Sequence, residues 1–129
     1  MRLARGLLVL SAAVFAVSGI AYLFVPSLAL ALVGIESEGT TDFLLRTEGV
    51  ALLTAAVFIA AIAMRPTSFT WLALAALGGY YVVGSLVDLL AFGDGVVGPA
   101  SVPSAGVRIA LGVLAVVAAW RVGGLPETP

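Results

Sequence analysis

The sequence contains no cysteine, no histidine and no lysine among its 129 residues. Without cysteine or histidine there is no disulfide, no thiol chemistry, no usual zinc site and no usual axial ligand for haem. The lack of lysine excludes a Schiff base to retinal or pyridoxal phosphate. A metal would need oxygen ligands, and the carboxylates do not follow calcium-loop spacing. We therefore expect no catalytic residue, no metal site and no cofactor.

Charged residues are scarce as well. They make up 10% of the chain, whereas 62% of the residues are hydrophobic and the mean hydropathy is +1.21. Six arginines and seven acidic residues give a net charge of −1. This balance excludes a basic nucleic-acid-binding protein, a disordered chain and a soluble enzyme of ordinary composition. The composition is typical of an integral membrane protein, so we expect membrane lipid as a partner.

Four apolar stretches are long enough to cross a hydrocarbon layer of about 30 Å, which takes about 20 helical residues. They run over about 5–25, 43–64, 70–92 and 103–121. Proline and glycine residues fall in the segments between them. Because a backbone in lipid must satisfy its own hydrogen bonds, we expect an all-α fold. The prediction is an antiparallel four-helix transmembrane bundle in a single domain over 1–129.

The arginines predict how this bundle is oriented. Four of them flank the same set of span ends: Arg2, Arg5, Arg65 and Arg121. The opposite loops have acidic residues and no basic flanking residue. Because basic residues stay on the cytoplasmic side, we expect both termini in the cytoplasm and the protein in the cell membrane.

The apolar segment over 26–35, between the first two spans, is too short to cross a membrane and begins with proline. It predicts a short interfacial or re-entrant helix after the first span. The alternative is a longer first helix with a kink at Pro26.

Four ionisable residues fall inside predicted spans: Arg46, Glu48, Asp88 and Arg108. At 1.5 Å per residue each lies roughly 5 to 8 Å inside the outer end of its helix. Four unpaired charges at this depth would be costly, so we expect a network in which Asp88 meets Arg108 while Arg46 and Glu48 complete it. Positions 46 and 48 are about 200° apart on a helix, so one of them faces a water-filled cavity or another subunit instead.

Helical spacing adds two residues to this layer. Tyr81, Ser85 and Asp88 recur at i, i+4 and i+7 on one face of the third span. The complete candidate polar cluster is Arg46, Glu48, Tyr81, Ser85, Asp88 and Arg108. Two interpretations remain open: a neutral network that fixes the register of the helices, or a small polar pocket open to the outside.

Three segments carry a family resemblance: YLFVPSLALALVGI, FLLRTEGVALLTAAVF and GGYYVVGSLVDLLAFGDG. With them, nearly the whole chain resembles the small four-helix prokaryotic membrane families related to DoxX, above all domain of unknown function 4345. The resemblance implies a four-helix membrane bundle without an established activity. DoxX is associated with respiratory and redox complexes, but this chain has no cysteine with which to share thiol chemistry.

The function that these features favour is non-enzymatic. We expect a small subunit or interaction partner in a membrane assembly, either a larger complex or a homo-oligomer. The alternative is binding or transport of a small amphiphile, a quinone, a lipid head group or an ion at the polar cluster. An enzyme would have to use Glu48, Asp88 or a tyrosine as its acid and base, and nothing specifies a substrate.

Overall fold

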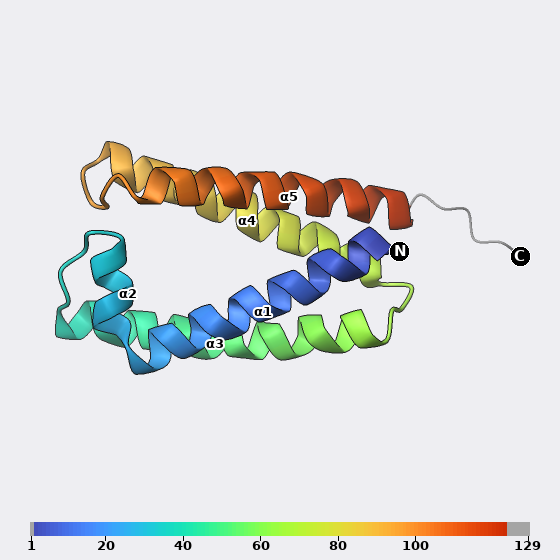
Figure 1. Cartoon of the computed structure of the whole chain (residues 1–129), viewed down its shortest axis with the longest axis horizontal. Coiled ribbons are helices and arrows are strands. Elements are labelled where there is room, and N and C mark those ends of the chain that lie inside the picture. Colours follow the sequence, from blue (N-terminus) through green and yellow to red (C-terminus); the bar gives the residue numbers. More distant parts are fainter. Residues whose placement is uncertain (1, 124–129) are drawn as a thin grey trace, which may run out of the picture.

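The computed structural model describes residues 2–123 and is helical throughout its regular elements (Figure 1). The helices are α1 (Arg2–Phe24), α2 (Pro26–Leu32), α3 (Gly39–Met64), α4 (Thr70–Gly93) and α5 (Ser101–Gly123). Four of them, α1, α3, α4 and α5, are long and apolar enough to cross a membrane. The predicted all-α fold with four apolar spans is therefore confirmed, and the composition is that of a membrane protein.

The segment after the first span forms its own short helix, not a kinked continuation of α1. Val25 leaves helical geometry with φ −133°, and Pro26 takes the first position of α2. Proline suits this position because its fixed φ starts a helix and its missing N–H is not needed there. Gly34 then ends the turn with φ +77°, a left-handed conformation that favours glycine. In Figure 1, α2 accordingly turns away from the axis of α1.

Helix α3 begins four residues before the predicted span because polar residues cap it. The Glu38 N–H donates to Thr41 Oγ1 at 2.9 Å, and Asp42 lies in the first turn. A carboxylate there is favourable beside the positive end of the helix dipole. The hydropathy pattern cannot detect such a turn, because its residues are polar.

The long helices pack as two pairs, α1 with α3 and α4 with α5 (Figure 1). Gly19 of α1 faces Gly49 of α3, and a Cβ added at either would lie 2.8 Å from the other's carbonyl oxygen. That is closer than Cβ atoms approach, so only glycine allows this backbone contact. Small residues at a helix interface are a common means of close packing in membranes.

The second pair repeats this construction. A Cβ at Gly78 of α4 would lie 2.9 Å from the Gly112 oxygen, and one at Gly112 of α5 would lie 3.0 Å from the Gly78 oxygen. In both pairs a tyrosine follows the first glycine by three residues, and its Cβ lies 3.1 Å from the Cβ position of the facing glycine. These residues are Tyr22 against Gly49 and Tyr81 against Gly112. The two pairs are thus locally equivalent units.

The two pairs approach each other at one end and diverge at the other. Figure 1 shows them closest beside the N-terminus, where an apolar cluster that includes Leu8, Ala63, Leu74 and Ala118 is buried. Toward the opposite end the pairs separate, and α2 lies between them (Figure 1). There the Gly98 N–H, in the α4–α5 loop, donates to the carbonyl of Val33 at 2.7 Å. This bond ties the end of α2 to the second pair.

Candidate functional site

A cavity of about 440 Å³ lies between the helix pairs where they diverge. We call it the interpair cavity. Its polar lining comes from all four long helices and consists of Ser18, Tyr22, Glu48, Tyr80, Asp88, Ser101, Ser104 and Arg108. Apolar residues of α2 and the segment after it, such as Leu30 and Val33, also line it. The two pairs and α2 therefore form the site jointly.

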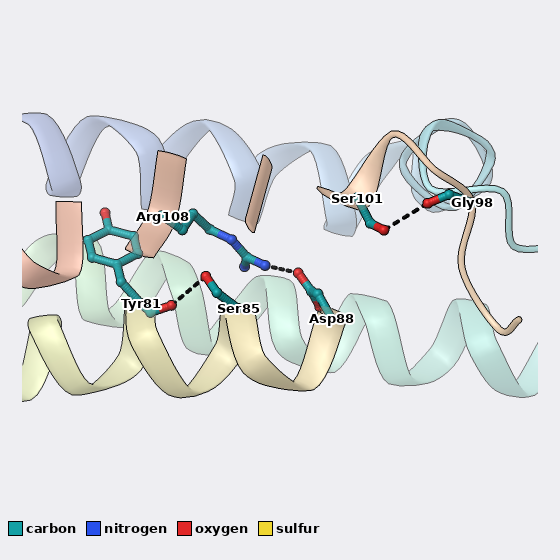
Figure 2. Close-up of polar contacts among 6 residues, drawn as sticks. All are labelled: Tyr81, Ser85, Asp88, Gly98, Ser101 and Arg108. Atoms are coloured by element: carbon teal, nitrogen blue, oxygen red, sulfur yellow. Dashed lines mark hydrogen bonds and ion pairs between the residues drawn. The ribbon is translucent and has the colours of Figure 1, made fainter. Parts of the chain in front are cut away.

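An ion pair between Arg108 of α5 and Asp88 of α4 is the central polar contact of the cavity (Figure 2). The Arg108 side chain is 28% exposed and that of Asp88 is 38% exposed, so both are partly buried. Gly84, one turn before Asp88, leaves room for the guanidinium: a Cβ there would lie 3.9 Å from Arg108 Nη1. The buried Arg108 Nε has no hydrogen-bond partner within the described chain.

Tyr81 and Ser85 belong to the predicted cluster, but they do not line the interpair cavity. The Tyr81 hydroxyl donates to Ser11 Oγ of α1 at 3.0 Å, and both residues are buried. Ser85 Oγ donates to the Tyr81 carbonyl at 2.6 Å, which satisfies a fully buried hydroxyl (Figure 2). The Tyr81–Ser11 bond joins the two helix pairs, whereas the Ser85 bond stays within α4.

Glu48 and Arg46 lie on different faces of α3. Both residues are exposed, but Glu48 lines the interpair cavity and Arg46 does not. Over residues 2–123 the ion pair found is Asp88 with Arg108, so the expected four-residue network is not formed. The reason is the rotation of about 200° between the two positions, which prevents both from reaching the same partner.

Aromatic packing places Tyr80, which the predicted cluster did not include. The rings of Phe15, Tyr80 and Tyr81 pack edge to face, with centroids 5.1 to 6.0 Å apart. This geometry is the favoured one for aromatic pairs and holds Tyr80 at the cavity wall. Across the cavity, Ser18 and Tyr22 are one turn apart on α1. Their i, i+4 spacing is a sequence pattern that indicates the α1 wall of the cavity. No such pattern in the sequence points to Tyr80.

No known protein family, curated protein or solved structure matches this chain. The resemblance to DoxX-related families stays a prediction. Residues 2–123 contain no cluster of three or more side chains that could hold a metal ion. The side chains that line the interpair cavity offer charge, hydroxyl groups and aromatic rings.

Proposed function

We propose that this protein binds the polar head of a small amphiphilic molecule in the interpair cavity. The cavity volume falls within the range of about 300–1,000 Å³ that is usual for small-molecule sites. Ionisable groups deep in membrane helices are costly and mark functional sites by default. The observation that carries the proposal is the open volume beside the ionisable side chains of the cavity. In a purely structural network these side chains would pack against one another and leave no such volume.

The lining of the cavity suits an amphiphile. Hydroxyl and charged side chains from the long helices form one part of the wall, and apolar side chains from α2 form another. A head group has polar partners in the first part, and the start of an alkyl chain has apolar surface in the second. Binding of this kind needs no catalytic group.

The proposal includes an orientation. The four long helices cross the cell membrane in antiparallel order, with both termini in the cytoplasm, because four arginines flank one set of helix ends. The interpair cavity then opens in the outer leaflet, and α2 lies at the outer interface. The chain has no cysteine, so single cysteines report this directly. Ser37→Cys should react with an impermeant maleimide from outside intact cells, and Ser68→Cys only after the cells are opened.

Occupancy is tested by filling the cavity. Ser18 lines it, whereas the adjacent Val17 is 68% exposed on another face of α1. Wild type, Ser18→Phe and the matched control Val17→Phe are reconstituted in nanodiscs of phosphatidylethanolamine and phosphatidylglycerol, and then examined by native mass spectrometry. We expect a retained amphiphile on wild type and Val17→Phe that Ser18→Phe loses. No retained molecule, or equal retention by all three proteins, contradicts the proposal.

A second candidate function is that of a subunit in a membrane assembly, and Arg46 favours it. This guanidinium lies inside the length of an apolar helix, is exposed, and has no ion-pair partner within residues 2–123. A carboxylate on a second copy or on another membrane protein would neutralise it. Crosslinking in membranes of wild type and Arg46→Gln tests this. Crosslinked species that the substitution abolishes support an assembly, and a monomer in both cases contradicts it.

A further inference from the structure

Resting on the proposed binding function, we infer that the head group is an organic cation and that Glu48 is its counterion. The charges of the interpair cavity carry this inference. Its lining holds two carboxylates, Asp88 and Glu48, and one guanidinium, Arg108. Arg108 is already neutralised by Asp88, so the charge left over is the negative one on Glu48.

A carboxylate in an apolar helix is costly without a counterion. Among residues 2–123, no basic side chain lies within ion-pair distance of Glu48. Arg46 is close in sequence, but it lies outside the cavity on another face of α3. An ammonium head group in the cavity supplies the missing positive charge.

The aromatic residues of the cavity suit the same ligand. Tyr22 of α1 and Tyr80 of α4 line it together with Glu48, so rings from both helix pairs border the space beside the carboxylate. Tyrosine rings attract cations through the negative face of the ring, and cages of this kind recognise alkylammonium groups. Leu30 of α2 supplies apolar surface for methyl groups or an alkyl chain.

An anionic head group fits the same residues poorly. It would have to share Arg108 with Asp88 and would face both Asp88 and Glu48 as like charges. A neutral head group without an ammonium leaves Glu48 without a counterion. The charge balance therefore selects a cation over both.

The test compares three amphiphiles that share a dodecyl chain: dodecyltrimethylammonium, dodecyl maltoside and dodecanoate. Each is titrated onto the protein in nanodiscs, and native mass spectrometry counts the retained molecules. We expect the cation to bind most tightly. Glu48→Gln should weaken its binding by at least about tenfold and leave that of dodecyl maltoside unchanged. Glu36→Gln is the matched control, because it removes an acidic side chain that does not line the cavity.

A second variant separates the role of the ring from that of the hydroxyl. Tyr80→Phe keeps a cation-binding ring and should retain dodecyltrimethylammonium, whereas Tyr80→Leu should weaken its binding. Thermal unfolding of each variant is measured in parallel, so that a loss of binding is compared only among folded proteins. Equal binding of the cation by Tyr80→Leu and wild type counts against a role of the ring.

The outcomes distinguish the two proposals. If all three amphiphiles bind equally, or dodecanoate binds best, the cavity is a binding site but the cation inference is wrong. If none is retained by wild type, the proposed function itself fails. A further pair of nanodiscs identifies the source of the cation. Retention of phosphatidylethanolamine from mixed nanodiscs indicates a lipid head group, whereas binding of dodecyltrimethylammonium in pure phosphatidylglycerol indicates a free amphiphilic cation.

Discussion

Two adjacent glycines of α4 allow a sharp test of the helix pairing. Gly78 lies against α5, where an added Cβ would be 2.6 Å from Val116 Cγ2 and 2.9 Å from the Gly112 oxygen. Gly79 has no atom within 4 Å of its Cβ position. Gly78→Ala and Gly79→Ala therefore make the same chemical change at neighbouring positions, and only the first meets another helix.

The magnitude follows from which neighbours can move. Val116 is exposed on its outer side and can rotate, but the Gly112 oxygen is backbone, so α4 and α5 must separate. Overpacking of this kind costs about 1–3 kcal/mol. Both variants also gain up to about 1 kcal/mol because alanine favours a helix more than glycine. That gain is common to both, so the difference between them isolates the packing cost of about 1–3 kcal/mol.

The assay is reversible unfolding in mixed micelles with increasing sodium dodecyl sulfate, followed by circular dichroism. Gly79→Ala should unfold at or above the wild-type midpoint and Gly78→Ala below that of Gly79→Ala. If their free energies of unfolding agree within about 0.5 kcal/mol, the backbone contact between α4 and α5 is not formed, and the equivalence of the two pairs fails with it.

Three further predictions concern contacts between helices. Asp88→Asn and Arg108→Gln should each lower the free energy of unfolding by about 1–3 kcal/mol, because each leaves the partner's half-buried charge without a counterion. In the same unfolding assay the double variant should lose less free energy than the sum of the two single losses. Tyr81→Phe should lower the free energy of unfolding by about 1 kcal/mol, and adding Ser11→Ala should lower it little further, because one hydrogen bond is lost once; additive losses would contradict that bond. Gly49→Ala carries the same packing cost, offset in part by the same helix gain, so its unfolding midpoint should lie at or below that of wild type; a midpoint above wild type would contradict the close contact of α1 with α3.

Much of the fold could be predicted from hydropathy alone. The ends of the four predicted spans lie within four residues of those of the long helices, because lipid forces an apolar run of this length into a helix whatever its neighbours are. Pro26 likewise predicted a break after the first span, since proline has a fixed φ and lacks an N–H. The start of α3 was missed because it depends on polar capping residues.

The candidate site was less accessible to sequence. Depth along each helix could be counted, so Glu48, Asp88 and Arg108 were placed at one level, and all three line the cavity. The rotation of each helix about its own axis, which decides which face it turns toward the other helices, could not be derived in this way. It leaves Tyr81 and Arg46 out of the lining of the interpair cavity.

The sequence by itself determined which segments are helical, how long they are and how far along its helix each charge lies, because these depend on hydropathy and on the geometry of one helix. The tertiary structure decided which helices pair, through the glycine contacts of α1 with α3 and of α4 with α5. It also decided that the pairs diverge around α2 and leave a cavity in which Glu48 has no ion-pair partner among residues 2–123. Pairing and divergence depend on contacts between residues far apart in the chain, and no local pattern encodes them.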